Sequence, residues 1–369
     1  MRKLLDAERA HMVKRREETG KSSDLDSDSL GIALSGGGIR SATICLGIME
    51  ELNKRGLIQQ ADYLSSVSGG GYLASYIHSA LQVKLSDTDN IGETRPEDAF
   101  DELFSESDKK HFMKYREYLY VWRGKSIQRI FSNIYLFIVA LLSTFLHSLW
   151  FIAPLIYRWI VYQNDFMTGK AAWFHFIVMV AIGLFFGFLL KPNYTSPHRF
   201  YKRRLKKAYL IYGSNLKLWQ LDRPEAPYPI LNANVSVDYD KYDKLKDVSY
   251  RGPIKSNYFI FTPLYSGSQV TNFTKSDSKT YKPITLATAM ATSAAAVNTF
   301  MGNFKLPFIA RQIMAILNLR TGILAPNPQY SKSYPSFWPY YTWLEVMGNS
   351  DTTKNYVQVS DGGHVENRG

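Results

Sequence analysis

Two long runs without a charged residue constrain this chain more than any other feature. The first extends from Ile134 to Ile156 and the second from Ala171 to Leu190. As helices, each would reach about 30 Å, the thickness of the hydrocarbon core of a bilayer. Tryptophans and tyrosines cluster near the segment that joins the runs, as in the aromatic belt of a membrane protein. The runs therefore predict a transmembrane helical hairpin over residues 131–190, with a kink at Pro154.

The charges on either side of the hairpin predict its orientation. The joining segment carries only Arg158 and Lys170 as basic residues, whereas both flanks are rich in them: Lys110, Lys114, Arg116, Arg123, Lys125 and Arg129 before it, and Lys191, Arg199, Lys202, Arg203, Arg204, Lys206 and Lys207 after it. The positive-inside rule then places both flanks in the cytoplasm and predicts a two-span membrane protein. The alternative is an apolar hairpin buried in a soluble core, or docked on a membrane without crossing it.

The net charge of +12 is explained in large part by these flanking residues. Basic side chains beside a membrane span attract anionic lipid headgroups. A nucleic-acid patch over Arg199–Lys207 is the rival interpretation, but the run directly follows an apolar span and no reader motif accompanies it. We therefore expect membrane phospholipids as partners and no nucleic acid.

A triple glycine follows the short apolar run Gly31–Leu34. Glycines at Gly36, Gly37 and Gly38 leave consecutive backbone N–H groups unhindered, which suits the binding of a developing oxyanion. A phosphate-binding nucleotide loop is the alternative, but no Gly-Lys-Ser/Thr follows the glycines.

A second motif, Ser66-Val67-Ser68-Gly69-Gly70, joins a strand-like run to a helix-like run. Ser68 would occupy a sharp strand-to-helix turn that presents its hydroxyl as a nucleophile. Glycine is more usual than serine at the first position of this pattern, and Ser66 is small enough to be a mild departure. A structural turn serine is the alternative.

A serine nucleophile needs a base within hydrogen-bonding reach. Of the seven histidines, only His364 lies in a suggestive context, and it follows Asp361 by just three residues, which is awkward for an aspartate that would orient the same imidazole. Asp361 is the better base, because it ends the strand-like run 356–360 and precedes two glycines that let the chain turn. Asp-Gly-Gly is otherwise a common hairpin turn.

These three motifs, in this order, resemble those of the patatin-like phospholipases, including the cytosolic phospholipase A group. The resemblance covers roughly residues 31–85 and 284–369, including the small-residue stretch Ala287–Ala296. It implies a three-layer α/β sandwich, here with the hairpin inserted. It also implies a Ser68–Asp361 dyad, an oxyanion hole at Gly36, Gly37 and Gly38, and contact between Arg40 and the substrate phosphate. A structural ion pair or helix-packing role is the alternative for Arg40.

The remaining sequence suggests four parts. A charged segment covers residues 1–30, a first catalytic part 31–130, the hairpin 131–190, and a second catalytic part 191–369. The lone Cys45 excludes an intrachain disulfide and favours a reducing compartment; its place on an apolar helix face predicts a buried residue. No Cys/His cluster has zinc spacing, and we expect a reaction without metal, calcium or cofactor.

We therefore expect a membrane-anchored serine acyl hydrolase that cleaves fatty-acyl esters of phospholipids or lysophospholipids. A lipid acyltransferase that uses the same acyl-enzyme is one alternative, and a non-catalytic membrane interaction protein is another. A homo-oligomer or a regulatory protein partner stays open.

Overall fold

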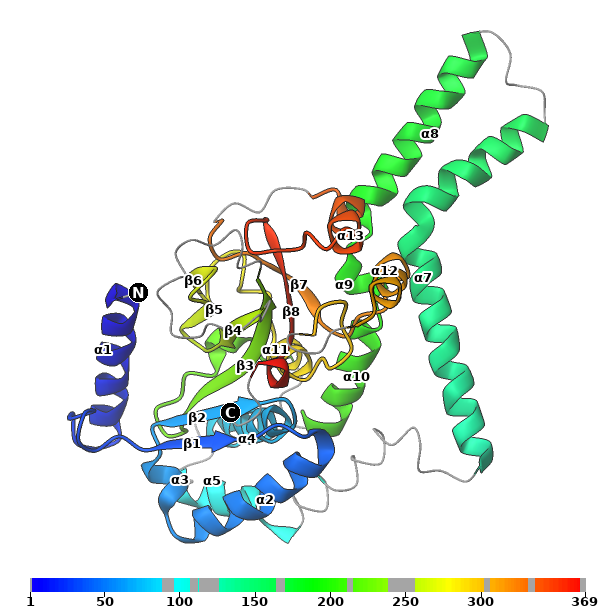
Figure 1. Ribbon diagram of the computed structural model, residues 1–369. Coiled ribbons are helices and arrows are strands. Elements are labelled where there is room, and N and C mark those ends of the chain that lie inside the picture. The colour runs from blue at the N-terminus through cyan, green and yellow to red at the C-terminus, as the bar shows by residue number, and fades with distance from the viewer. Residues whose placement is uncertain are drawn as a thin grey trace.

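The computed structural model describes residues 2–87, 96–106, 112, 126–163, 170–210, 215–237, 256–301, 306–330 and 336–365. Within these ranges the chain forms a central mixed sheet with helices packed around it, from which two long helices project (Figure 1). The α/β fold with an inserted pair of apolar helices, expected from the sequence, is thus confirmed.

The sheet combines a parallel part with an antiparallel part. Its main path runs in the order β1-β2-β3-β4-β5-β6, and β8 pairs with both β3 and β7. The first three strands are parallel, and β4 turns the sheet antiparallel. The strands are β1 (Gly31–Leu34), β2 (Tyr63–Val67), β3 (Tyr228–Ser236), β4 (Ser256–Phe261), β5 (Tyr265–Ser268), β6 (Asn272–Lys275), β7 (Ile323–Pro326) and β8 (Tyr356–Asp361).

Two shorter strands, β2 and β8, pair one after the other with the same edge of β3. β2 pairs in parallel with its first half and ends with Val67 opposite Asn232. β8 pairs antiparallel with its second half and ends with Asp361 opposite Ala233. The carboxyl ends of β2 and β8 therefore meet head to head at the middle of β3. This register brings together residues that lie almost 300 positions apart in the sequence.

The helix α4 (Gly69–Asp87) is the central helix of the domain. Its residues are buried from Gly69 to Leu81, as expected for a helix whose surface is apolar or small on all sides. It packs against α2 (Gly38–Lys54), α10 (His198–Tyr209) and α11 (Leu286–Ser293). Cys45 of α2 is buried, as expected. The other helices are α1 (Arg2–Glu18), α3 (Leu57–Gln60), α5 (Pro96–Leu103), α9 (Pro192–Thr195), α12 (Phe308–Ile316) and α13 (Trp338–Val346).

The helix α1 is more firmly docked than its charged sequence suggested. Arg16 is 2% exposed, and its guanidinium donates to the Asp62 carboxylate at 2.7 Å. Arg15 is 5% exposed and pairs with Asp222. The segment 1–30 is therefore held to the domain by buried ion pairs, which a count of charges alone could not reveal.

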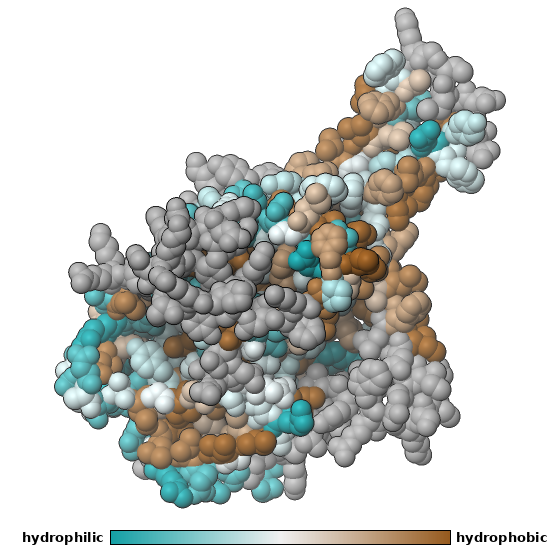
Figure 2. Space-filling model, viewed as in Figure 1, coloured by the Kyte–Doolittle hydropathy of each residue, from teal (hydrophilic) through white to brown (hydrophobic). Residues whose placement is uncertain are grey.

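The two apolar helices are α7 (Ser126–Gln163) and α8 (Lys170–Leu189). Both contain a stretch that is long and apolar enough to cross a membrane, Phe137–Tyr162 and Ala172–Leu189, and only 11% and 6% of these stretches is buried. Hydrophobic side chains cover much of the projecting pair in Figure 2. This exposure argues against a hairpin buried in the core of the domain. Exposed apolar surface of this extent is typical of a site that contacts a membrane or another protein.

The helix α7 has two parts with different neighbours. Its first part lies against the domain, where Thr144 donates a hydrogen bond to the Leu317 carbonyl at 3.0 Å. Its second part pairs with α8, where the Tyr157 hydroxyl lies 2.7 Å from His175 Nδ1. The helix bends between these parts (Figure 1). The part of α7 that pairs with α8 thus projects from the domain, and the first part of α7 connects it to the domain.

The proline in α7 is accommodated by a glycine in α8. Pro154 lies inside the helix, so the carbonyl of Trp150 loses its usual donor four residues later. A Cβ on Gly183 would lie 3.2 Å from that carbonyl oxygen and 3.4 Å from Pro154 Cγ. The absence of a side chain at Gly183 therefore lets α8 pack closely over the altered turn.

Candidate active site

Ser68 lies in a strained turn between β2 and α4. Its φ of +50° is in the left-handed region, which residues other than glycine seldom adopt. The turn depends on the glycines that follow: a Cβ on Gly69 would lie 2.1 Å from the Gly38 carbonyl oxygen, and one on Gly70 would lie 2.3 Å from the Leu34 carbonyl oxygen. The sequence Ser-Gly-Gly thus lets the turn pack directly against the end of β1 and the glycine loop.

The Ser68 hydroxyl faces the carboxylate at the end of β8. Ser68 Oγ donates a hydrogen bond to Asp361 Oδ2 at 3.3 Å, and the other carboxylate oxygen accepts the Gly363 N–H at 2.8 Å. The serine is 8% exposed and the aspartate 6% exposed. A contact of this length is loose for two oxygens, as catalytic hydrogen bonds often are without a bound substrate.

The pKa of the Asp361 carboxyl depends on its burial and on two hydrogen bonds. Burial raises the pKa of its carboxyl to about 6, while the hydrogen bonds from Gly363 and Ser68 lower it. The carboxylate is therefore mainly ionised at neutral pH and still basic enough to take a proton. The structure brings together the two residues that the sequence predicted as nucleophile and base.

The glycine loop lies beside this pair. Gly37 and Gly38 have φ of +136° and +64°, so side chains at either position would be strained. Among the residues described, none accepts a hydrogen bond from the N–H groups of Gly36 and Gly37. The contact between Gly38 and Gly69 places this loop next to Ser68. The loop that the sequence predicted as an oxyanion hole therefore lies next to the Ser68 turn.

Arg40 lies in the first turn of α2, directly after the glycine loop. Its side chain is exposed and forms no ion pair with any described residue. An interior ion pair, considered as the alternative from the sequence, is not its environment. No described residue therefore neutralises this guanidinium at the start of α2.

His364 lies in the short 3-10 turn Gly362–His364, which directly follows β8. Its Nδ1 atom is 3.4 Å from the Ser360 hydroxyl. Burial lowers the pKa of this imidazole, and a backbone hydrogen bond involving Ala296 raises it. The imidazole of His364 thus has hydrogen-bond partners close to it in the chain and in the fold.

Ser293 contacts the turn at Ser68, and sequence reasoning assigned it no role. Its hydroxyl accepts the Ser68 backbone N–H at 3.1 Å and donates to the Asn232 carbonyl at 2.5 Å. It therefore connects the strained turn to the middle of β3, where β2 and β8 meet. The small-residue stretch Ala287–Ala296 was the available signal, since only a short polar side chain fits here.

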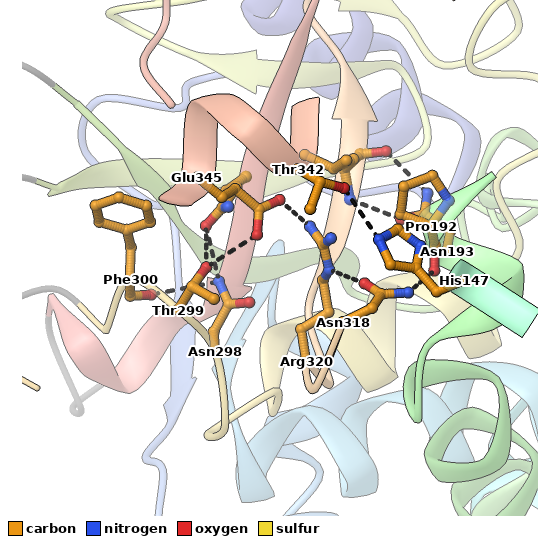
Figure 3. Close-up of polar contacts among 12 residues, drawn as sticks. His147, Pro192, Asn193, Asn298, Thr299, Phe300, Asn318, Arg320, Thr342 and Glu345 are labelled. Carbon is orange, nitrogen blue, oxygen red and sulfur yellow. Dashed lines mark hydrogen bonds and ion pairs between the residues drawn. The ribbon is translucent and has the colours of Figure 1, made fainter. Parts of the chain in front are cut away.

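A buried polar network extends from β8 toward the root of the hairpin (Figure 3). Gln358 accepts from the Thr299 hydroxyl at 3.1 Å, and the Thr299 hydroxyl also donates to Glu345 at 3.4 Å. Glu345 pairs with Arg320, and both side chains are almost fully buried. Burial raises the Glu345 pKa, and Arg320 lowers it. Such a pair is expensive to break, because either partner alone would leave a buried charge.

The same network reaches the apolar helices. Arg320 donates to Asn318 at 2.7 Å, and Asn318 donates to the Thr195 hydroxyl of α9 at 3.0 Å. His147 of α7 lies 3.0 Å from the Thr342 hydroxyl of α13 and 3.5 Å from the Thr195 hydroxyl. The base of the hairpin is thus connected by hydrogen bonds to the strand that carries Asp361. Among the described residues, no group of three or more His, Cys, Asp and Glu side chains is arranged to hold a metal ion.

Comparison with known proteins identifies phospholipases with partial similarity to this chain. No family model matches it. A segment of 48 residues is 40% identical to the Saccharomyces cerevisiae protein named "Putative meiotic phospholipase SPO1", covering 13% of this chain and 8% of that protein. Human GIVD cytosolic phospholipase A2 is similar in structure, with a TM-score of 0.44 and 13% identity over 98% of this chain and 47% of that one.

The same human enzyme in complex with methyl gamma-linolenyl fluorophosphonate is also similar, with a TM-score of 0.35 and 13% identity over 98% of this chain and 40% of that one. This chain thus spans less than half the length of the solved structures that it matches.

Proposed function

We propose that this protein is a membrane-anchored serine acyl hydrolase that cleaves fatty-acyl esters of phospholipids or lysophospholipids. The observation that carries the proposal is the buried Ser68–Asp361 hydrogen bond of 3.3 Å, formed by a serine with a φ of +50° beside a glycine loop. A strained nucleophile, a base with a raised pKa and adjacent N–H groups are the parts that acyl transfer requires.

In the first half of the reaction, the Asp361 carboxylate takes the proton of the Ser68 hydroxyl as its oxygen attacks the ester carbonyl. The carbonyl oxygen gains negative charge in the tetrahedral intermediate, and N–H groups of the glycine loop stabilise it. As the intermediate collapses, the proton passes from Asp361 to the departing alcohol. The fatty-acyl group is left as an ester on Ser68.

In the second half, Asp361 removes a proton from water as the water oxygen attacks the acyl ester. A second tetrahedral intermediate collapses, the fatty acid leaves, and Ser68 recovers its proton from Asp361. Arg40 would contact the substrate phosphate, because its exposed guanidinium follows the glycine loop and can bind phosphate through two parallel hydrogen bonds.

The membrane anchor of this proposal is the α7–α8 hairpin, with two spans and the catalytic domain in the cytoplasm. The exposure of its apolar side chains and the basic residues on both flanks support this arrangement. Substrate and enzyme would then meet at the cytoplasmic leaflet. The basic flank before the hairpin lies outside the described residues, apart from Arg129 in the first turns of α7.

The test of the activity is incubation of the full chain, solubilised in a non-ionic detergent, with defined phospholipids and lysophospholipids. Mass spectrometry should detect free fatty acid and the matching lysolipid, and Ser68→Ala should abolish both. His364→Ala is the matched control and should retain substantial activity. A loss with His364→Ala as deep as that with Ser68→Ala would contradict the dyad mechanism.

The same detergent-solubilised protein distinguishes the hydrolase from the two alternatives, an acyltransferase and a non-catalytic membrane protein. An acyltransferase would transfer the acyl group to an added lipid or polyol in preference to water, so the product would change with the acceptor. A non-catalytic membrane protein would release no fatty acid, and a fluorophosphonate probe would fail to label Ser68. Labelling that is lost in Ser68→Ala would support the hydrolase or the transferase.

The anchor is tested separately by cysteine labelling in a Cys45→Ala background. Asn164→Cys, in the joining segment and outside the described residues, should react with an impermeant reagent from the outer side. Ser22→Cys should react only after permeabilisation. Extraction of the protein by alkaline carbonate would contradict a spanning hairpin, because removing two apolar spans from lipid is far more costly than breaking electrostatic contacts.

A further inference from the structure

A large cavity lies beside the root of the hairpin and is lined by basic side chains. Its volume is about 800 Å³, and none of its twenty lining residues is an aspartate or a glutamate. Six of them are basic: Lys191, Arg199, Lys202, Arg203, Lys206 and Lys279. A concave surface with one sign of charge concentrates ions of the opposite sign. We call this feature the basic cavity.

One face of α10 supplies most of this charge. Arg199, Lys202, Arg203 and Lys206 are spaced by three or four residues, so they lie on the same side of the helix. The opposite side of α10 packs into the domain through Leu205, Ala208 and other buried residues. Packing on one side of α10 therefore fixes the orientation of its basic side, and the four like charges are held close together along the cavity.

These charges are not neutralised within the part of the chain that the structure describes, because none of the six basic side chains pairs there with a carboxylate. Lys202 Nζ donates to the Thr288 hydroxyl at 3.4 Å, and Lys206 Nζ donates to Asn215 Oδ1 at 2.8 Å. Burial lowers the Lys202 pKa, and the nearby Arg199, Lys206 and Arg203 lower it further. A bound anion would favour the charged form of Lys202 and so counteract the lowering of its pKa.

The position of the basic cavity is set by the end of α8. Lys191 follows the last residue of that helix, Leu189, by two positions, and α9 and α10 continue directly from it (Figure 1). If α8 crosses the bilayer, residues just beyond its end lie at the level of the lipid headgroups. Tyr194, which also lines the cavity, is 63% exposed, as is common for an aromatic residue at a membrane interface.

The basic cavity is separate from the catalytic site. Tyr356, the first residue of β8, lines the cavity, whereas Asp361 is the last residue of that strand. Ser68 and the glycine loop do not line it. A ligand in the cavity would therefore be distinct from the ester that is cleaved.

We infer that the basic cavity is a binding site for a headgroup that carries several phosphates, such as that of a polyphosphorylated inositol lipid in the cytoplasmic leaflet. Six cations without a carboxylate partner among the described residues exceed what one zwitterionic headgroup could neutralise, whereas several phosphates would match them. The apolar residues of the lining, including Ile323, Leu324 and Trp338, would contact the glycerol and the first part of the acyl chains. The lipid source rests on the proposed membrane anchor, and the phosphate site itself does not.

Direct binding to the detergent-solubilised full chain tests this inference, with Ser68→Ala as the background so that no ligand is hydrolysed. The four probes are dioctanoyl phosphatidylinositol 4,5-bisphosphate, inositol 1,4,5-trisphosphate, dioctanoyl phosphatidylcholine and a short single-stranded oligonucleotide. Isothermal titration calorimetry measures the affinity of each one. This assay measures binding and not turnover, so it tests the phosphate site independently of the proposed hydrolase activity. A chain without hydrolase activity could still bind the probes, and an active hydrolase could fail to bind them.

The informative variant replaces Arg199, Lys202 and Arg203 by glutamine, and the control replaces Lys54, Arg55 and Lys207, which lie outside the cavity. Both change the net charge equally. We expect the cavity variant to bind the bisphosphate lipid at least about tenfold more weakly, since each charge-assisted hydrogen bond to phosphate is strong, and the control to change less than about twofold. The two variants should melt at similar temperatures.

The probes also identify the source of the phosphates. Tighter binding of the lipid than of inositol trisphosphate supports a membrane ligand, and equal affinity assigns the site to a soluble phosphate compound. Equal weakening by both variants would overturn the inference, because it would indicate general attraction of anions. No binding of either phosphate probe would overturn it as well, as would tighter binding of the oligonucleotide.

Discussion

Asp361→Asn is expected to inactivate the protein and to stabilise it at the same time. The carboxyl group is almost fully buried, and its pKa rises from 3.8 to about 6 because burial disfavours the charged form. The folded chain therefore holds an ionised carboxylate at neutral pH at a cost in stability. Asparagine carries no charge, and its oxygen can still accept the Gly363 N–H while its amide donates to the Ser68 oxygen.

The size of the effect follows from the pKa difference. A rise from 3.8 to about 6, at about 1.4 kcal/mol for each pH unit, corresponds to about 3 kcal/mol. The cost is fully present above pH 6, where the folded carboxyl is ionised. It declines as the pH falls, because the folded state takes up its proton before the unfolded state does. Near pH 4 only about 0.6 kcal/mol should remain.

Thermal unfolding in detergent, followed by tryptophan fluorescence at pH 8, 6 and 4, measures this difference. With about 2 cal/mol/K of unfolding entropy per residue and 369 residues, the variant should melt roughly 4 °C above the wild type at pH 8 and almost equally at pH 4. The matched control, Asp277→Asn, removes an exposed carboxylate and should change stability by less than about 0.5 kcal/mol.

Two results would refute this reasoning. One is a variant no more stable than the wild type at pH 8, and the other is a gain of the same size at pH 4. The same carboxylate should also give kcat/KM an acid limb with a midpoint near pH 6, falling about tenfold for each pH unit below it. A limb near pH 4 would show that burial does not raise the pKa of Asp361 as the structure indicates.

Three further substitutions test the surroundings of the site. Gly69→Ala would place a Cβ 2.1 Å from a backbone oxygen of the glycine loop and should lower kcat about 100-fold, whereas Gly47→Ala, with nothing within 4 Å, should keep full activity. Arg40→Lys should slow phospholipid hydrolysis more than hydrolysis of a neutral short-chain ester, because lysine lacks the two-pronged guanidinium; equal losses on both would argue against phosphate contact. Arg320→Met should lower the free energy of unfolding, measured by denaturant titration, by about 3 to 5 kcal/mol, because it leaves Glu345 buried and unpaired. Adding Glu345→Leu should restore most of this loss, and no recovery would contradict a charge-based cause.

The sequence determined those features that depend on residues close together in the chain. The strained turn at Ser68 follows from a strand, one serine and adjacent glycines, and the apolar helices follow from uncharged runs long enough to cross a bilayer. Both are local signals, because backbone freedom and hydrophobicity are set by the residues themselves. The choice of Asp361 as the partner of Ser68 rested on its place between a strand-like run and two glycines, and on resemblance to a family.

The tertiary structure decided what depends on distant segments. The register of β3 brings the ends of β2 and β8 together, so that Ser68 meets a carboxylate 293 positions away. Ser293 gains its role only because α11 packs beside that junction, and Arg320 is buried only because Glu345 faces it. No local pattern marks such residues, since their environment is created by the packing of separate elements. Burial also raises the pKa of Asp361, and that burial is created by the fold and by no local sequence pattern.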